Sequence, residues 1–388
     1  MSVSAFAHLL PGVLPSSSAW DGPWGPALSA AYTEAVRGVG RTQPNPPVGC
    51  VIVDVDGAIV ARGHHERAGE GHAEVNALNA LIGDRGEGSA RGLTAVVTLE
   101  PCAHHGRTPP CADRLVREGV ARVVVGTLDP NPRVDGRGIE RLTAAGIDVV
   151  VADGAAAAAC AALIAPFAQS IVPTASPRPW VVLKTATSLD GRVATRSGAS
   201  RFITGPHSRA LVHALRDAVD GVVVGANTVV VDDPALTVRD FRRADGSAVR
   251  DPRRVVLDRR CKVALTARIF DPPGALLVHD ATSTGKPLYG VEHVAVAGFE
   301  LASILGALQA RGLASVLVEA GPRLSAALLS AGLVDELWWF HAPLIIGADG
   351  AAAVGGLDVT AIADARRGTL AHRVLVGDDV LTVLSDLR

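Results

Sequence analysis

The sequence predicts two α/β domains joined by a short proline-rich segment. The chain has 388 residues, enough for two domains of ordinary size. Helical and strand-like patterns alternate in both halves, which is typical of α/β domains. Prolines at 173, 177 and 179 interrupt regular structure between the halves. The expected division is a leader at 1–26, a first domain at 27–168, a linker at 169–179 and a second domain at 180–388.

The leader at 1–26 is rich in Ser, Pro and Gly, so we expect a flexible or loosely packed segment. It lacks the basic start and the long apolar core of a signal peptide. No run approaches 18 apolar residues, so we expect no membrane span and no membrane partner.

In the first domain, helices and short apolar strands follow one another. A hairpin around the Asp56-Gly57 turn joins two apolar runs, which is a strong strand signal. The pattern predicts a three-layer α/β domain with a mixed sheet. The expected helices are 27–39, 73–83, 111–118, 137–145 and 154–165, and the expected strands are the hairpin 48–62, 95–99, 123–126 and 148–151.

After the linker a second α/β series begins. It starts with an apolar run at 180–186 and ends with a hairpin around Gly377-Asp378. The strands expected between them are 221–225, 254–258, 275–279, 315–319 and 336–343, and the expected helices are 206–219, 301–311 and 321–332.

Charge and cysteine content limit the functional classes. The formal net charge is -2 and no Lys/Arg cluster stands out, so a nucleic-acid partner is not expected. The five cysteines have no regular spacing, which argues against a disulfide framework and favours a reducing, cytoplasmic compartment.

The clearest chemical motif lies in the first domain. His72-Ala73-Glu74 is followed by Pro101-Cys102 and then by Cys111. One imidazole and two thiolates can hold a catalytic zinc that keeps a fourth position open for water. Glu74, at a helix start two residues after the histidine, could carry protons. Zinc nucleobase deaminases carry His-x-Glu with Pro-Cys-x-x-Cys, whereas eight residues separate the cysteines here.

Alternatives remain for these residues. Two isolated cysteines are often buried small apolar groups, and a lone His-x-Glu carries little information. His104 and His105 are rival ligands, which we rank below His72. Cys50, Cys160 and Cys261 are expected to be core residues.

With these motifs, the chain resembles the bacterial bifunctional riboflavin deaminase-reductases. The resemblance rests on the segments 42–49, 71–75, 99–111, 129–132 and 136–139, and that family has the long cysteine spacing. It implies a cytidine-deaminase-like three-layer α/β/α domain with zinc on His72, Cys102 and Cys111 and with Glu74 as the catalytic proton shuttle. It also implies a substrate pocket lined by Asn45, His64, His104, Arg107 and Asn131.

The residues of the second half alone indicate its function less clearly. It has no Gly-x-Gly-x-x-Gly after a strand, so a Rossmann interpretation is weak. At 318–324 and 224–228, however, an apolar strand meets a helix through glycine, and free N–H groups at a helix start attract phosphate. Two such junctions are consistent with a bound dinucleotide, but also with ordinary strand-to-helix turns.

The resemblance extends over residues 27–388 and implies a dihydrofolate-reductase-like α/β second domain. It rests there on the segments 184–192, 203–205, 225–228, 232–239 and 333–337. It implies NADPH contacts at Ala186, Phe202, Thr228, Asp232, Gly321, Pro322, Arg323, Leu324, Ser325, Ala326 and Ala327. The implied substrate contacts are Ser200, Arg216, Leu236, Arg239 and Glu319, with Lys184 in the same cleft.

Three positions depart from the family pattern. Phe202 stands where a tryptophan is expected, and its smaller ring can still stack on a cofactor. Arg259 stands where a small hydroxyl residue is common, so it either removes a contact or adds a cation near a cofactor phosphate. The segment 155–167 lacks an asparagine expected near Ile164.

We therefore predict a bifunctional enzyme of riboflavin biosynthesis that binds one zinc per chain and NADPH. Its small-molecule substrates are 2,5-diamino-6-(5-phosphoribosylamino)pyrimidin-4-one, which it deaminates, and 5-amino-6-(5-phosphoribosylamino)uracil, which it reduces. Candidates for the acid of the reduction are Lys184, Asp190 and Glu319. We also expect a homo-oligomer. The other interpretations are a nucleic-acid deaminase with a binding module, disfavoured by charge, and a non-catalytic zinc protein, disfavoured by Glu74.

Overall fold

The computed structural model describes residues 3–13, 20, 22–103, 109–131, 136–174, 176–283 and 290–388. The chain folds into two compact units, Gly12–Pro173 with Val3–His8 and Thr174–Arg388 with Leu9–Pro11. The division falls within the segment 169–179, although a helix that the sequence did not separate, Ala165–Ile171, extends into that segment. We call Gly12–Pro173 the first unit and Thr174–Arg388 the second unit.

The first unit is built on a five-stranded sheet with the order β2-β1-β3-β4-β5. Strand β1 runs antiparallel to β2 and β3, and β3, β4 and β5 are parallel. The strands are β1 (Gly49–Val53), β2 (Ile59–His64), β3 (Thr94–Val97), β4 (Arg122–Val125) and β5 (Asp148–Val151). The helices are α1 (Gly25–Arg37), α2 (Ala73–Arg85), α3 (Cys111–Glu118), α4 (Arg137–Ala144), α5 (Gly154–Leu163) and α6 (Ala165–Ile171).

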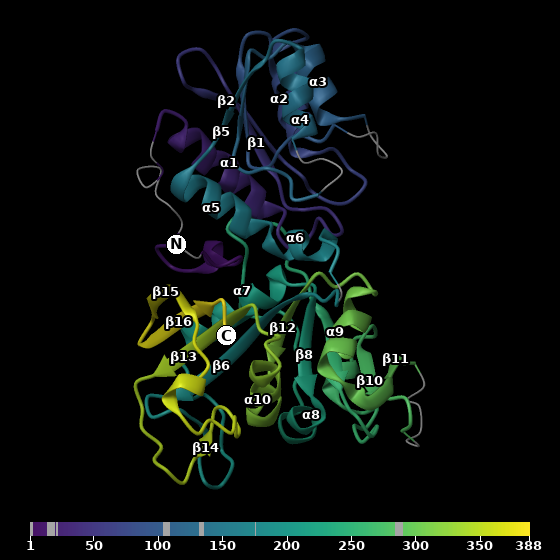
Figure 1. Ribbon diagram of the computed structural model, residues 1–388, viewed down its shortest axis with the longest axis vertical. Helices are drawn as coiled ribbons and strands as arrows, with labels where there is room; N and C mark the ends of the chain where they lie inside the picture. Colours follow the sequence, from purple (N-terminus) through teal and green to yellow (C-terminus); the bar gives the residue numbers. More distant parts are fainter. Residues whose placement is uncertain are drawn as a thin grey trace. The chain divides into compact units, whose positions relative to one another are not determined.

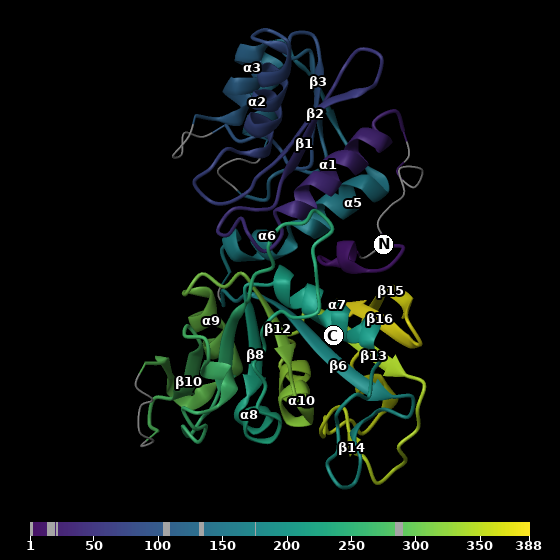
Figure 2. The same cartoon turned by 180° about the vertical axis from the view of Figure 1, so that it is seen from behind.

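Helices cover both faces of this sheet. Figures 1 and 2 show α2, α3 and α4 on one side and α1 with α5 on the other. One buried leucine from each of α2, α3 and α4 packs in a cluster with Cys50 and Ile52 of β1; these leucines are Leu78, Leu115 and Leu142. Because β1 is buried along its whole length, its residues read as a continuous apolar run rather than an alternation. The predicted three-layer arrangement with a mixed sheet is therefore present.

Part of the N-terminal segment is packed. The Trp20 side chain is buried and meets Tyr32 of α1 edge-on, with ring centroids 5.5 Å apart. Trp20 is thus packed, whereas composition suggested a flexible or loosely packed leader.

The second unit is built on a nine-stranded sheet with the order β11-β10-β9-β8-β12-β6-β13-β16-β15. The strands from β11 to β13 are parallel, and β16 and β15 add an antiparallel hairpin. They are β6 (Trp180–Ser188), β8 (Gly221–Gly225), β9 (Arg253–Leu257), β10 (Leu276–Asp280), β11 (Glu292–Val296), β12 (Ser315–Glu319), β13 (Glu336–Ala342), β15 (Thr369–Val376) and β16 (Asp379–Ser385). A small separate sheet pairs β7 (Arg192–Ala194) with β14 (Ala351–Ala352).

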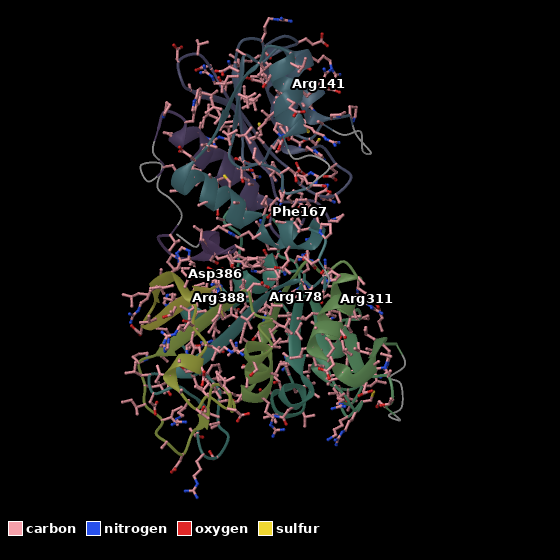
Figure 3. All side chains as sticks on the ribbon, viewed as in Figure 1. Arg141, Phe167, Arg178, Arg311, Asp386 and Arg388 are labelled. Carbon is pink, nitrogen blue, oxygen red and sulfur yellow. The ribbon has the colours of Figure 1, made fainter. Side chains whose placement is uncertain are left out.

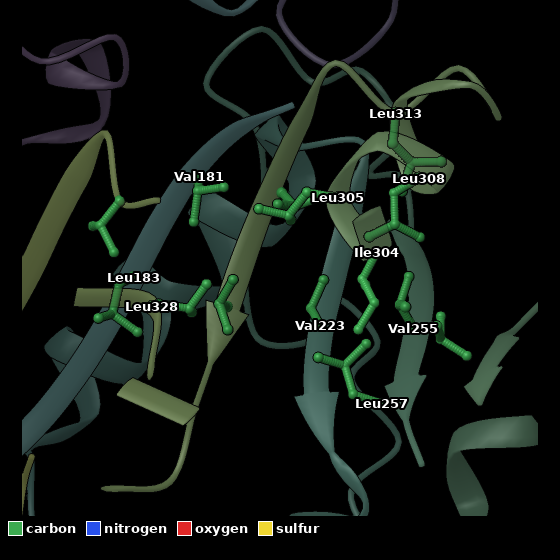
Figure 4. Packing of buried hydrophobic residues seen from close by; sticks show 14 of the residues in the cluster. Val181, Leu183, Val223, Val255, Leu257, Ile304, Leu305, Leu308, Leu313 and Leu328 are labelled. Atoms are coloured by element: carbon green, nitrogen blue, oxygen red, sulfur yellow. The ribbon is translucent and has the colours of Figure 1, made fainter. Parts of the chain in front are cut away.

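The helices of the second unit connect the parallel strands. They are α7 (Pro206–Ala218), α8 (Ala226–Asp232), α9 (Leu301–Gln309) and α10 (Pro322–Ser330). Short 3-10 helices lie at Arg268–Phe270, Ala297–Phe299 and Ile362–Asp364 in this unit and at Ala7–Leu9 near the N-terminus. Figure 4 shows Ile304, Leu305 and Leu308 of α9 and Leu328 of α10 against side chains of the parallel strands such as Val223. This burial fixes the carboxyl ends of β6, β8 and β12 beside one another.

Ion pairs tie elements together within each unit. Arg178, labelled in Figure 3, makes two hydrogen bonds to the Asp335 carboxylate, at 2.6 and 2.9 Å. Asp335 also accepts the Val181 N–H at 2.7 Å, which secures the start of β6. In the first unit Arg141 of α4 reaches Asp113 of α3 at 2.7 Å.

Among the described residues, no single helix is long and apolar enough to cross a membrane. Helices α5 and α6, bent by 61° at their junction, pass the length and composition criteria only as a pair.

Candidate functional site

Three side chains with soft or borderline donor atoms meet in the first unit. His72 is the N-cap residue of α2, Cys102 lies in the loop after β3, and Cys111 is the first residue of α3. The His72 Nδ1 atom lies 3.6 Å from Cys102 Sγ and 3.3 Å from Cys111 Sγ. All three donor atoms lie within 4.8 Å of one another. The structure thus brings together the residues that the sequence assigns to zinc.

The spacing of these atoms fits a tetrahedral zinc ion. Zn–N and Zn–S bonds of ordinary length place nitrogen and sulfur ligands about 3.5 Å apart. Hydrogen bonds from Cys111 and His72 lower the pKa of the Cys102 thiol to about 4, so a thiolate is the natural form there. Among the described residues, only these three donors cluster in this way, and three protein ligands with an open fourth position are typical of catalytic zinc sites.

Glu74 lies in the first turn of α2, beside this cluster. Its side chain is 3% exposed, and burial raises the pKa of its carboxyl to about 7. It is not one of the clustered donors, yet it interacts with both cysteines. A carboxyl held here can exchange protons with a molecule bound beside the cluster.

A pocket of about 460 Å³ opens over the cluster. His72, Glu74 and Cys102 form part of its lining, and so do the predicted substrate contacts Asn45 and Asn131. Phe167 of α6, labelled in Figure 3, adds an aromatic surface. The predicted contacts His104 and Arg107, and the rival ligand His105, lie outside the described residues.

The structure differs from the prediction at His64. His65 lines the pocket, and His64 does not. His64 ends β2, and its Nδ1 lies 3.5 Å from the Glu34 carboxylate of α1. Successive residues of an extended chain point to opposite sides, so its neighbour faces the pocket instead. His65 is only 2% exposed and was missed because two adjacent histidines give the same sequence signal.

The wall of the pocket around Asn131 is held by Glu100. This buried carboxylate accepts N–H groups of Asp129 at 3.3 Å, Gly136 at 3.1 Å and Gly138 at 2.9 Å. Asp129 in turn accepts the Asn131 N–H at 2.9 Å. A carboxylate that satisfies several backbone donors fixes the surrounding chain strongly.

The second unit has its own pocket, of about 450 Å³, at the carboxyl ends of β6 and β12. Predicted cofactor contacts that line it are Ala186, Phe202, Thr228, Asp232, Gly321 and Pro322. Predicted substrate contacts that line it are Lys184, Ser200 and Glu319. The remaining cofactor predictions, Arg323, Leu324, Ser325, Ala326 and Ala327, continue into α10 and are not part of the lining.

Charged groups are concentrated at one wall of this pocket. Lys184 of β6 and Glu319 of β12 are register partners, and Arg216 of α7 donates from Nε to Glu319 at 2.7 Å. Burial lowers the pKa of Lys184. Burial raises the pKa of Glu319, but the Arg216 and Lys184 charges outweigh it and bring the value to about 2. Glu319 is therefore a carboxylate at neutral pH rather than a proton donor.

Arg216, Leu236 and Arg239 do not line the pocket directly. Arg216 is 8% exposed, and its Nη1 donates to the Thr237 carbonyl at 3.1 Å. The Arg239 N–H donates to His213 Nδ1 at 3.0 Å. The Arg216 guanidinium is thus engaged by Glu319 and Thr237, whereas Arg239 is exposed.

Two further residues change the sequence interpretation. The Asp190 carboxylate accepts the Ser188 hydroxyl and the N–H groups of Ile346 and Gly347, which lower its pKa to about 2. Asp190 therefore holds a loop and is a poor acid for the reduction. Arg209, which the motifs did not single out, lines the pocket with its guanidinium 5.0 Å from the Phe202 ring centroid.

Two family models match the chain. A cytidine and deoxycytidylate deaminase zinc-binding region matches residues 26–127, and a RibD C-terminal domain matches residues 179–382. They confirm the predicted fold class for both halves, and the first match supports zinc as the metal.

Full-length relatives match as well. The riboflavin biosynthesis protein RibD of Escherichia coli K12 is 42% identical over 369 residues, covering 91% of this chain and 96% of the relative. The same-named protein of Aquifex aeolicus is 38% identical with the same coverage.

Solved structures agree with these relatives. Acinetobacter baumannii RibD, form 1, aligns with a TM-score of 0.80 at 38% identity, over 92% of this chain and 97% of the other. A diaminohydroxyphosphoribosylaminopyrimidine deaminase/5-amino-6-(5-phosphoribosylamino)uracil reductase from Thermotoga maritima aligns with a TM-score of 0.80 at 34% identity, over 92% and 96%.

Proposed function

Because the chain belongs to the RibD family of riboflavin biosynthesis proteins and carries both its deaminase and its reductase domain, we propose that it catalyses two successive reactions. The first is hydrolytic deamination of 2,5-diamino-6-(5-phosphoribosylamino)pyrimidin-4-one. The second is NADPH-dependent reduction of the ribosyl chain of 5-amino-6-(5-phosphoribosylamino)uracil to a ribityl chain. The joint placement of His72, Cys102, Cys111 and Glu74 at one pocket carries the first half of this proposal.

In the deaminase, His72, Cys102 and Cys111 hold the zinc. Bound zinc supplies a Lewis acid that makes water a nucleophile at neutral pH. Glu74 takes a proton from the attacking water and returns protons to the ring nitrogen and to the leaving amine. The carbon–amine bond breaks, ammonia leaves, and a carbonyl remains on the ring.

Polar and aromatic side chains of the pocket recognise the pyrimidine substrate. Asn45 and Asn131 offer amide groups to the polar edge of the pyrimidine, and Phe167 offers an apolar face. From the family resemblance we also propose His104 and Arg107 as substrate contacts, the latter for the phosphate.

In the reductase, the second pocket takes the cofactor. Gly321 is the N-cap residue of α10 and has no side chain that could bond the N–H groups of the first helical turn. The free N–H groups of that turn are therefore available to a cofactor phosphate. Phe202 presents an exposed ring for stacking, with Ala186, Thr228 and Asp232 beside it. Bound NADPH supplies the hydride for the reduction.

The charged wall of that pocket orients the sugar. Lys184 and Glu319 are register partners that line the pocket. We propose that Lys184 holds the proton that goes to the nitrogen attached to the opened ribosyl chain, while the hydride goes to the neighbouring ribosyl carbon. We propose Ser200 and Leu236 as further contacts and Arg216 with Arg239 as phosphate ligands. Arg216 would reach a phosphate with the part of its guanidinium not engaged by Glu319 and Thr237.

One experiment tests both halves. The diaminopyrimidinone phosphate is supplied with NADPH, and ammonia release and NADPH oxidation are followed together. Ammonia must appear first and NADPH loss must follow. If ammonia is absent, or if NADPH is consumed without prior deamination, the proposed order is wrong. The Cys102→Ser/Cys111→Ser double variant should lose both zinc and ammonia release while still reducing pre-deaminated substrate.

A further inference from the structure

A buried histidine connects the zinc-ligand loop to the substrate pocket. His65 Nδ1 lies 3.0 Å from the Gly71 carbonyl oxygen, directly before the ligand His72. A carbonyl oxygen can only accept, so Nδ1 carries the hydrogen and donates it. The same carbonyl accepts a second bond from Asn76 Nδ2 at 3.1 Å, and Asn76 also donates to the His64 carbonyl at 2.8 Å. Gly71 is therefore held firmly in place.

The other nitrogen of His65 settles the orientation of Asn45. With hydrogen on Nδ1, the neutral ring has an acceptor at Nε2. Asn45 Nδ2 lies 3.0 Å from Nε2 and donates to it. The amide NH2 of Asn45 is thus turned towards His65. Its Oδ1 has no partner among the described residues and is left for the pocket, which Asn45 lines.

Other roles for His65 do not fit these contacts. Both ring nitrogens are engaged, so the ring has no site free to carry a proton to the substrate. Its nitrogens are not among the clustered metal donors of the described residues. Its ring packs edge-on against His72, with centroids 5.2 Å apart, and is nearly inaccessible to solvent.

We propose that His65 is a positioning residue that fixes the Asn45 amide as a hydrogen-bond acceptor, so that Asn45 recognises an N–H donor of the pyrimidine, from an amine or a ring nitrogen. The inference deepens the proposed deaminase function and rests on it. Without His65 the amide can rotate by a half turn and present NH2 to a substrate donor, a mismatch that weakens binding.

A double-mutant cycle tests this role of His65, because an aspartate at position 45 offers an acceptor oxygen to the substrate in either side-chain orientation. Both carboxylate oxygens accept, so an Asn45→Asp chain presents an acceptor whether or not His65 is there. Loss of His65 should therefore weaken substrate binding in the natural background and matter little in the Asn45→Asp background. Simple structural damage would cost the same in both.

The cycle is measured as the Kd of the diaminopyrimidinone phosphate by titration calorimetry. All variants carry Glu74→Gln, so that binding is separated from turnover. We expect His65→Gln to raise Kd about 10-fold with Asn45 present, and less than about 2-fold with Asn45→Asp present. His64→Gln is the matched control, because that ring contacts Glu34 outside the pocket lining, and it should leave Kd unchanged. Zinc content reports on the folding of each variant.

Each outcome is decisive. Equal losses in both backgrounds, or an Asn45→Asp chain that keeps zinc but does not bind substrate, would overturn the inference. If His65→Gln loses zinc, His65→Asn replaces it in the cycle with the same expected non-additivity. Ammonia release by the unmodified chain is measured first, because its absence would contradict the proposed function rather than the role of His65.

Discussion

At the scale of single residues, Glu74 has the most specific assignment. It is buried beside the thiol and imidazole donors but is not one of them. We expect Glu74→Gln to retain zinc and to lose roughly 10²–10⁴-fold in deamination rate, the usual contribution of a general acid–base group. Metal analysis and an ammonia assay check this. Reduction of pre-deaminated substrate is the control, and a variant with more than a tenth of normal deamination would contradict the assignment.

The lowered pKa of Glu319 predicts how the stability of the folded protein changes at acid pH. Its pKa is lowered in the folded protein to about 2, so its carboxylate contributes stability above the unfolded-state pKa. That contribution, on the order of 3 kcal/mol, is lost as pH falls from about 4.5 towards 2. Thermal melts across this range should show a steeper loss in the unmodified chain than in Glu319→Gln. Parallel curves would mean that Arg216 and Lys184 do not stabilise the carboxylate.

The sequence could assign residues where the chemistry is rare and the spacing specific. His72, Cys102 and Cys111 were such a case, and the structure brings them together. It could not separate His64 from His65, because only the direction of the chain after β2 decides which ring faces the pocket. Arg209 was missed for a related reason: an exposed arginine on a helix looks solvated until a pocket is known.

At the scale of elements, the contact between the start of α4 and the ligand loop makes a sharp prediction. A Cβ added at Gly138 would lie 2.0 Å from the Pro101 carbonyl oxygen, so Gly138→Ala must displace backbone next to Cys102. We expect zinc affinity to fall roughly 10–100-fold, as for residues that support metal ligands. A zinc competition titration with a chromophoric chelator measures the change.

The matched control for Gly138→Ala is Gly83→Ala, in α2. A Cβ at Gly83 meets no atom within 4 Å, and alanine is the better helix former by about 1 kcal/mol. Zinc affinity should be unchanged there, and thermal stability equal or higher. Equal zinc loss in both variants would show that the close approach at Gly138 has no special effect.

The predicted elements are incomplete where local propensity and tertiary context disagree. Helix α8 contains Thr228-Val229-Val230-Val231, a run of β-branched residues that favours a strand. It is nevertheless helical after the extended Gly225. The strand-to-helix junction at 224–228 indicated a helix start, but no helix range was predicted there. Strand β11 has a polar start and was not predicted, although pairing with β10 makes it regular. Apolar strands such as β12 were predicted because burial on both faces leaves a continuous apolar run.

At the scale of the whole molecule, the division into two compact units predicts two separable responses to ligands. The proposed zinc ligands lie in the first unit, so a chelator should lower the unfolding temperature of that unit alone. NADPH should raise only that of the second unit. At a concentration 100 times its Kd, a ligand stabilises by about 2.7 kcal/mol, which corresponds to roughly 5–10 °C for a domain of this size.

Differential scanning calorimetry of the full chain distinguishes the two transitions. In the Cys102→Ser/Cys111→Ser variant the chelator should have no further effect, while the NADPH shift should persist unchanged. A fragment beginning near Ser176 should show the same NADPH shift without zinc, because the cofactor pocket is formed by residues 184–351. If that fragment folds but does not respond to NADPH, the cofactor assignment is wrong. If the chelator also lowers the unfolding temperature of the second unit, the two units do not unfold independently. Zinc must then affect the stability of the second unit as well as that of the first.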